Sequence, residues 1–308
     1  MRKLPLAALW FAAVLALPAS GSAPGPMPPR PVPAIEHVIV IIVDGLRPDL
    51  LLLADAPTMH AMVQGGAYSF WARTTDLAIT LPSCTSMLTG VKPAKHGVTW
   101  NGALPADKQV YPADPTVLEM ATRAGYVTAL VAGKLKFATL CKPGTVTHVW
   151  VPPVPVIHDE RVTAEAVKLI EACRPALMCI HFPDVDAVGH AKGWGSPEQL
   201  AQVATTDAQI ALVLAALDRA GLRGSTLMLL TADHGGAGLT HGAGDMRSRH
   251  IPWVVSGPGV RKGYDLTRNA ALQVNTEDTC ATVCWLLGLP QQPDFDGKPV
   301  TAAFTPAK

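Results

Sequence analysis

Three apolar segments of the chain are each followed within a few residues by an aspartate. They are residues 37–43 before Asp44, 176–182 before Asp186 and 226–232 before Asp233. Continuous apolar runs of this length are typical of strands that are buried on both faces of a parallel sheet. Ligands bind outside the carboxyl ends of such strands. The sequence therefore predicts that the three carboxylates meet at one edge of a sheet.

Histidines accompany two of these aspartates at a spacing that suits metal ligands. His190 follows Asp186 by four residues, His234 directly follows Asp233, and His241 lies shortly after it in Thr-His-Gly. Gathered carboxylates repel one another unless cations neutralise them. A mixed set of nitrogen and oxygen ligands suits zinc or a similar transition metal. A metal centre is expected, although a lone histidine is also commonly a satisfied structural side chain.

The start of the chain has the pattern of an export signal. Positive charge at residues 2–3 precedes an apolar run at 4–17 and small residues up to 23, which predicts a signal peptide over residues 1–23. The apolar run is shorter than the ~20 residues that span a bilayer, so no stable membrane anchor is expected, with an uncleaved anchor as the alternative. The expected location is periplasmic or secreted, after cleavage.

The remaining chain divides into a linker and one domain. Residues 24–35 are rich in proline and predict a stiff extended linker. Residues 36–305 are long enough for one large α/β catalytic domain. The formal net charge of +1 gives no electrostatic reason to expect a nucleic-acid partner. The six cysteines are too few for a disulfide-built scaffold. A bridge from Cys173 to Cys179 or Cys141 and buried free thiols both stay open.

Strand and helix patterns alternate along residues 36–305. Strands are expected at 127–131, 146–151 and 253–255, and helices at 58–63, 116–124, 161–172, 197–220 and 277–287. This alternation predicts a parallel sheet that is covered by helices on both faces.

Thr80 precedes an apolar helical segment, 84–88, that is closed by Thr89-Gly90. A threonine at a helix N-terminus has a structural role as a capping residue. Its hydroxyl also lies at the positive end of the helix and could be ionised by a metal, which would make it a nucleophile. Both interpretations are open from this segment alone.

Taken together, these segments resemble the type I phosphodiesterase / nucleotide pyrophosphatase family of the alkaline phosphatase superfamily. The segments that carry the resemblance are 43–47, 80–82 with 89–90, 96–97 followed by Asn101, 183–190 and 231–235. The resemblance implies an alkaline-phosphatase-like three-layer α/β/α fold with a mostly parallel central sheet. Ser83 and Cys84 depart from the family pattern, because Asn and His are common at those positions.

The resemblance also implies a ligand set for two divalent metal ions, expected to be Zn²⁺. One zinc would be bound by Asp44, Thr80, Asp233 and His234. The other would be bound by Asp186, His190 and His241. His250 is a rival to His241. His241 is preferred because Thr-His-Gly at its distance before Gly257-Pro258 resembles the final-ligand segment of the family, whereas His250 precedes a predicted strand.

The implied reaction is hydrolysis of a phosphodiester or pyrophosphate bond in a small-molecule phosphate ester. Thr80 would be the nucleophile and would form a phospho-threonine intermediate, and Asn101 would contact the phosphoryl oxygens. Because an amide is a neutral donor, it suits the single charge of a diester better than the double charge of a monoester. A diester preference is therefore expected.

Two alternatives remain from the sequence. A phosphomonoesterase, phosphonate hydrolase or sulfatase would use the same centre on another substrate, and a non-catalytic metal-binding module would keep only the fold. Thr80 disfavours a sulfatase, because sulfatases use a Cys or Ser that is matured to formylglycine. A monoesterase would need extra cations, and the candidates are expected to be surface charges. These candidates are Arg47, Lys92, Lys134, Arg247 and Arg249.

Overall fold

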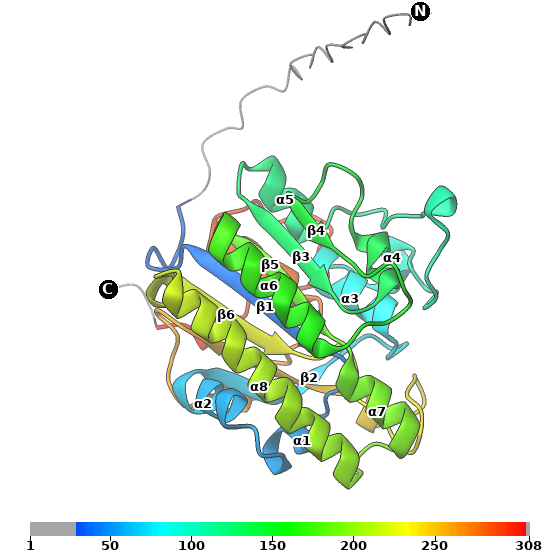
Figure 1. The fold of residues 1–308 in the computed structure, drawn as a ribbon. Helices are drawn as coiled ribbons and strands as arrows, with labels where there is room; N and C mark the ends of the chain where they lie inside the picture. Colours follow the sequence, from blue (N-terminus) through cyan, green and yellow to red (C-terminus); the bar gives the residue numbers. More distant parts are fainter. Residues whose placement is uncertain (1–28, 306–308) are drawn as a thin grey trace, which may run out of the picture.

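A computed structural model describes residues 29–305 of the chain (Figure 1). The predicted signal peptide, 1–23, and the first part of the predicted linker lie outside the described residues. The described part contains one eight-stranded sheet with the strand order β4-β3-β5-β1-β6-β7-β2-β8. The strands are β1 His37–Val43, β2 Ala67–Arg73, β3 Thr128–Ala132, β4 His148–Trp150, β5 Leu177–Phe182, β6 Thr226–Thr231, β7 His250–Ser256 and β8 Tyr264–Asp265.

The centre of the sheet is parallel, as the apolar runs predict. β1 lies between β5 and β6 and pairs with both in parallel, and β3 pairs in parallel with β5 and β4. All residues of β3, β5 and β6 are buried. Such strands need apolar side chains on both faces, which explains why their sequences do not alternate.

One edge of the sheet departs from the parallel pattern. Among the described strands, β7 alone runs antiparallel to its neighbours, β6 and β2. β2 and β8 were not predicted from the sequence. β2 mixes buried and partly exposed residues, and Trp71 is 60% exposed, so β2 lacks the continuous apolar run that marks the central strands.

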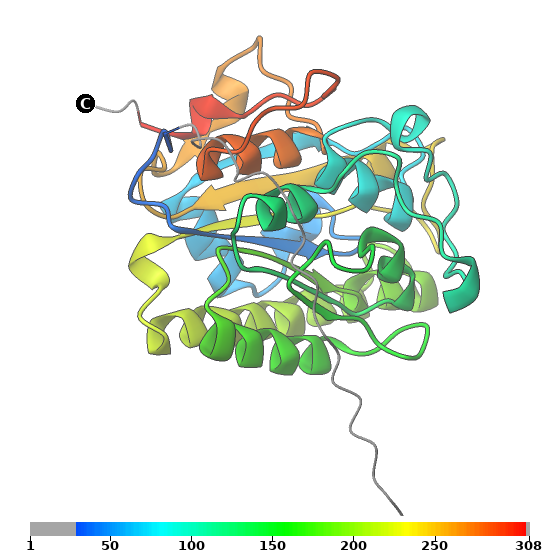
Figure 2. The same cartoon turned by 90° about the horizontal axis from the view of Figure 1, so that it is seen from above.

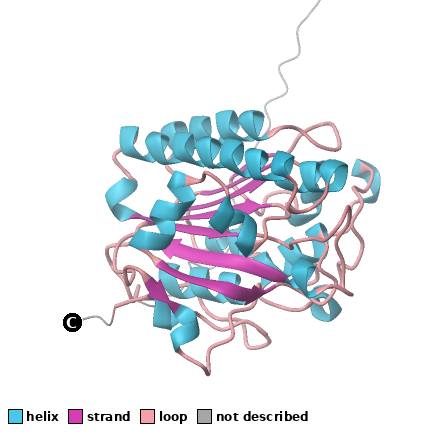
Figure 3. Cartoon of the chain, turned by 90° about the horizontal axis from the view of Figure 1, so that it is seen from below, coloured by secondary structure: helices cyan, strands magenta, loops and turns pink. Residues whose placement is uncertain are grey.

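Helices cover both faces of the sheet (Figures 2 and 3). One layer contains α1, α2, α6, α7 and α8, which contact one another, and the other contains α3, α4, α5 and α10. This arrangement confirms the expected mixed α/β fold with a mostly parallel sheet. The helices are α1 Pro48–Leu53, α2 Pro57–Gly65, α3 Thr80–Thr89, α4 Pro93–His96, α5 Val117–Arg123, α6 Asp159–Cys173, α7 Asp184–Lys192, α8 Pro197–Arg219, α9 Met246–Arg249 and α10 Asp278–Leu287.

The long helix α8 is apolar enough, by length and composition, to span a membrane, and it is the one such helix among residues 29–305. In the fold it packs against α6, α7 and α2. Its side chains Val203, Ile210, Val213 and Leu217 are fully buried. The apolar composition of α8 is therefore used in packing within the domain.

All six cysteines lie within the described residues and none forms a disulfide there. Cys84, Cys179, Cys280 and Cys284 are buried. Burial raises the pKa of the Cys179 thiol, which keeps it protonated. Of the two alternatives from the sequence, the structure contains the free thiols.

Candidate metal centre and catalytic pocket

The first cluster of ligand side chains forms where β1 and β6 end. Asp44 follows β1, and Asp233 and His234 follow β6. His234 Nε2 lies 3.4 Å from Asp44 Oδ1 and 3.3 Å from Asp233 Oδ2. All three side chains are fully buried. The structure thus brings together the three non-threonine residues predicted for one metal.

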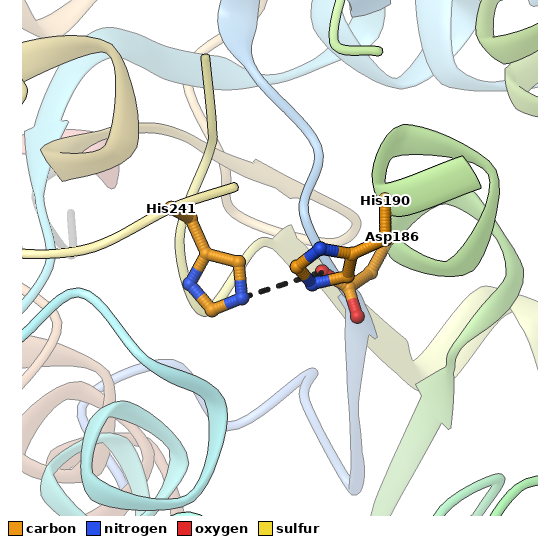
Figure 4. A group of neighbouring side chains, drawn as sticks. All are labelled: Asp186, His190 and His241. Atoms are coloured by element: carbon orange, nitrogen blue, oxygen red, sulfur yellow. Dashed lines mark ion pairs between the residues drawn. The ribbon is translucent and has the colours of Figure 1, made fainter. Parts of the chain in front are cut away.

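The second cluster joins α7, which follows β5, to the loop after β6. Figure 4 shows Asp186, His190 and His241 turned towards one another. Asp186 Oδ1 lies 3.4 Å from His190 Nε2 and 3.7 Å from His241 Nε2. The rings of His241 and His234 stack with their centroids 3.6 Å apart, so the two clusters are direct neighbours.

Each of the three histidines turns its Nε2 atom to the carboxylates and its Nδ1 atom to a backbone carbonyl. The Nδ1 atoms of His190, His234 and His241 lie 2.9, 2.8 and 2.9 Å from the backbone carbonyls of Leu239, Gly235 and Ala78. A carbonyl only accepts, so Nδ1 carries the proton and Nε2 keeps a free lone pair. A backbone partner of this kind fixes the tautomer of a metal-binding histidine.

The carboxylates also leave atoms free for a metal. Asp44 Oδ1, Asp186 Oδ1 and Asp233 Oδ2 are buried without a hydrogen-bond partner among residues 29–305. Buried polar atoms are normally paired, and these three are the oxygens that face the histidine Nε2 atoms. The donor set of carboxylate oxygens and imidazole nitrogens therefore fits a divalent metal ion in each cluster.

Thr80 lies beside the first cluster, as the first residue of α3. Its Oγ1 is 3.2 Å from His234 Nε2, and Ile79 occupies the N-cap position. Within the described residues the Thr80 side chain forms no capping hydrogen bond. The Thr80 hydroxyl thus faces the first cluster of ligand side chains, and the interpretation of Thr80 as a capping residue is wrong.

Asn101 connects the helix that carries Thr80 to the pocket. Its Oδ1 accepts from the Leu81 backbone N–H at 2.9 Å and from Lys136 Nζ at 3.0 Å. The two donors fix the amide, so its Nδ2 group is left to donate. Because the Leu81 N–H donates to Asn101, it is not free to contact a phosphoryl oxygen.

A cavity of about 300 Å³ opens above the second cluster. It is lined by Thr80, Asn101, Ala103, Lys134, Lys136, Pro155, Val156, Asp186, His190 and His241. A larger cavity of about 500 Å³ is lined by Arg73, Lys92, Arg249 and neighbouring residues. None of the cluster residues lines the larger cavity, so we assign the chemistry to the smaller one.

Lys134 is buried in this site, and its expected role as a surface charge is wrong. It is 6% exposed, and its Nζ lies 2.6 Å from Asp44 Oδ2 and 2.6 Å from Asp186 Oδ2. The signal was present in the sequence, because Lys134 follows β3 by two residues. It therefore lies at the same edge of the sheet as the three aspartates. Lys136 lines the same cavity and was not among the cations predicted from the sequence.

Burial and the neighbouring charges shift the pKa values of the side chains in both clusters. Burial raises the pKa of Asp44, but the charge of Lys134, the hydrogen bond and charge of His181 and the charge of His234 together outweigh it and hold this pKa well below its usual range. Burial and the charge of Asp44 raise the pKa of Asp233. Burial lowers the pKa of His234, and burial together with His234 lowers that of His241 to about 4. The neutral imidazole, which is the form that binds metals, is thus favoured.

His181 is a further buried residue of the site that the sequence analysis missed. It lies inside β5, and its Nε2 is 2.9 Å from Asp44 Oδ2. A histidine within an apolar strand gave no motif to detect. The contact orients Asp44, so that the opposite oxygen, Oδ1, faces His234.

His250 belongs to neither cluster. It begins β7, and its ring meets Trp71 edge-on at a centroid distance of 5.0 Å. His96, which precedes Asn101 in one of the segments that carry the family resemblance, also lies outside both clusters: its Nε2 lies 3.0 Å from Ser86 Oγ, and its Nδ1 accepts from Val98 N–H. It therefore supports α3 and does not face the pocket.

Gly45 sets how closely the two clusters approach. Its φ is +75°, and a Cβ at this position would lie 2.9 Å from the Cα of Asp186. No side chain fits there without moving the backbone. The Gly45 N–H also donates to Asp233 Oδ1 at 3.1 Å, so this residue contacts both clusters.

Comparison with known proteins supports the class that fold and site define. The described part has the fold of murine ectonucleotide pyrophosphatase / phosphodiesterase 5, whose solved structure is of an inactive variant in complex with AMP. The TM-score is 0.75 at 16% identity, and the match covers 88% of this chain and 100% of that chain. The phosphonate monoester hydrolase of Silicibacter pomeroyi matches with a TM-score of 0.62 and 18% identity, and the match covers 87% of this chain and 76% of that chain. The fold is shared with these two enzymes, and the site contains two groups of potential metal ligands.

The particular family follows from the sequence match. Residues 38–247 match the model of the type I phosphodiesterase / nucleotide pyrophosphatase family, and the chain belongs to this family. Membership confirms the resemblance and the enzyme class, a hydrolase that acts on phosphate ester bonds. The family depends on divalent metals, which agrees with the two clusters.

The matches to curated relatives cover a smaller share of the relative than the matches to the solved structures do. The human GPI ethanolamine phosphate transferase 2, catalytic subunit, is 24% identical over 282 residues, which are 87% of this chain and 28% of the relative. Arylsulfatase K of Danio rerio is 33% identical over 102 residues, 32% of this chain and 19% of the relative. The chain spans less than a third of the length of these relatives.

Proposed function

We propose that this protein hydrolyses phosphodiester or pyrophosphate bonds of small molecules with Thr80 as the nucleophile. The observation that carries the proposal is the position of the Thr80 hydroxyl, 3.2 Å from His234 Nε2 and at the wall of the cavity that the second cluster lines. A buried hydroxyl beside the first cluster, at the wall of the cavity that the second cluster lines, would be within reach of a phosphorus atom held in that cavity. Oγ1 would bond to phosphorus as the bond to the leaving oxygen breaks, and water would then hydrolyse the phospho-threonine.

Two divalent metal ions, which we propose to be zinc, belong to this function. Asp44, Thr80, Asp233 and His234 would bind one, and Asp186, His190 and His241 the other. Bound metals supply Lewis-acid chemistry that activates a hydroxyl and stabilises charge on phosphoryl oxygens. The unpaired carboxylate oxygens and the free Nε2 lone pairs support this assignment.

The chain itself contributes orientation and hydrogen bonding. Asn101 would donate its Nδ2–H group to a non-bridging oxygen, because its Oδ1 already accepts from Leu81 and Lys136. A donor that is fixed before the substrate binds loses little on reorganisation and stabilises developing charge effectively. Pro155 and Val156 line the same cavity and would contact the leaving group.

The substrate class is tested by comparing an aryl phosphodiester, the matching monoester and an aryl sulfate on the zinc-loaded protein. We expect kcat/KM to be highest for the diester. A clear monoester preference would replace this proposal by the second candidate below, and turnover of the sulfate alone would exclude both.

Asn101→Ala is expected to lower kcat/KM for the diester by roughly 10- to 1000-fold, as the removal of one oxyanion donor does in other enzymes. The matched control is Asn275→Ala, because Asn275 lines the larger cavity and not the catalytic one. Equal losses in the two variants would show that Asn101 has no special contact with the substrate.

A second candidate is a phosphomonoesterase, and two lysines favour it. Lys134 and Lys136 line the cavity together with Thr80, whereas the expected diester preference assumed that Asn101 is a neutral donor without a nearby cation. Two ammonium groups suit a dianionic phosphoryl group better than a neutral donor does. The ester comparison above separates the two candidates.

The proposed location is periplasmic or secreted, without a stable membrane anchor, and it depends on the predicted signal peptide. N-terminal sequencing of the protein recovered outside the cytoplasm would test it. Because cleavage is expected near Gly21 to Ala23, the new N-terminus should fall at residues 22–24; recovery of the chain from Met1 would contradict cleavage.

A further inference from the structure

Lys134 connects the two ligand clusters. Its Nζ lies 2.6 Å from one oxygen of Asp44, in the first cluster, and 2.6 Å from one oxygen of Asp186, in the second. Among the described residues it is the one lysine or arginine that pairs with a carboxylate of either cluster. The position of Lys134 is therefore specific to the boundary between the clusters.

The lysine and the histidines contact opposite oxygens of the same carboxylates. Lys134 takes Asp44 Oδ2 and Asp186 Oδ2. The Oδ1 atoms of the same residues face the Nε2 atoms of His234 and His190 at 3.4 Å, and both Oδ1 atoms are without a hydrogen-bond partner in residues 29–305. The lysine thus leaves the oxygens on the histidine side free, so it and the metals do not compete for the same atoms.

The charge balance of the site gives the lysine a role before any metal is bound. Three carboxylates, Asp44, Asp186 and Asp233, are 0%, 4% and 0% exposed. Buried like charges are costly unless an opposite charge lies beside them. Lys136 contacts the neutral Asn101, whereas Lys134 contacts two of the carboxylates directly.

We propose that Lys134 is a permanent internal cation of the metal centre. It keeps the two clusters assembled in the metal-free protein, and it stays beside the metals when they bind. Its positive charge then lowers the affinity of the site for divalent ions, because like charges repel in a buried site. This inference rests on the metal centre of the proposed function, but not on the role of Thr80.

The test compares metal-free and zinc-loaded protein for Lys134→Met, which removes the charge and keeps the side-chain length. After treatment with a chelator, the Tm of this variant is expected to fall by roughly 10 °C, because a buried ion pair has lost one partner. With zinc bound, the difference in Tm from the wild type should be less than half as large. Zinc affinity, measured by competition with a chelator, should rise at least about tenfold.

Lys136→Met is the matched control, because it removes a lysine from the same cavity without touching a carboxylate. Its metal-free Tm and its zinc affinity should stay near the wild-type values. An equal fall in the metal-free Tm of both variants would overturn the proposal, and so would zinc binding that is unchanged or weaker in Lys134→Met.

A double variant separates charge from packing. Adding Asp186→Asn to Lys134→Met removes one of the unbalanced negative charges, and it should recover at least half of the lost metal-free Tm. If the double variant is no more stable than Lys134→Met, or if neither folds even with zinc, Lys134 acts by packing and the proposal is wrong. These readouts do not use turnover, so a failure of the proposed reaction would leave them unaffected.

Discussion

Thr80→Ala is expected to lower kcat by several orders of magnitude while the protein keeps its metal content. The reason is that the Thr80 hydroxyl faces His234 and the catalytic cavity, and loss of a nucleophile removes the chemical step itself. The cost in stability should be about 1 kcal/mol, the contribution of one hydrogen bond. Turnover, zinc content and Tm of the purified variant check the three parts of this prediction.

Thr85→Ala is the matched control for that variant. Thr85 lies on the same helix, is also fully buried, and donates its hydroxyl to the Leu81 carbonyl at 2.7 Å. We expect it to lose some stability and to keep activity. If Thr80→Ala retained more than a small fraction of wild-type turnover, Thr80 would not be the nucleophile.

His241→Ala is expected to lose one metal ion and to lower kcat/KM by more than ~100-fold, whereas His250→Ala should do neither. His241 Nε2 faces Asp186, and its Nδ1 is held by the Ala78 carbonyl; His250 packs against Trp71, outside both clusters. Removal of a ligand both weakens metal binding and disturbs the site. Metal analysis after dialysis of the two variants, together with activity, is the measurement. A loss of metal confined to His250→Ala would reverse the assignment.

The sequence predicted the centre of the fold because burial on both faces leaves a clear pattern. β1, β5 and β6 are continuous apolar runs, and their parallel pairing follows from the helices between them. β2 and the antiparallel direction of β7 were not predictable in this way. Their pairing depends on contacts between residues far apart in the chain, such as Tyr68 with Val254, and a local pattern does not contain that information.

The residues of the candidate site also divide into those that a local sequence pattern reveals and those that it does not. Residues in motifs at strand ends, such as Asp44 and His234, were identified from their spacing. Lys134 and His181 were not, because a lysine is usually exposed and a histidine inside a strand has no distinguishing neighbours. What places both in the site is the tertiary packing of β3 and β5 against β1.

The close approach of Gly45 to Asp186 makes the separation of the two ligand clusters a property of the backbone. The absent side chain at residue 45 lets the turn after β1 rest against the start of α7, and this approach to the Asp186 Cα does not depend on which ligand side chains are present. Exchanging a histidine for a carboxylate in one cluster would change the preferred metal and leave the spacing intact. In the proposed metal centre, metal identity and the spacing of the two ligand clusters would therefore be specified by different parts of this chain, so that each could diverge without altering the other.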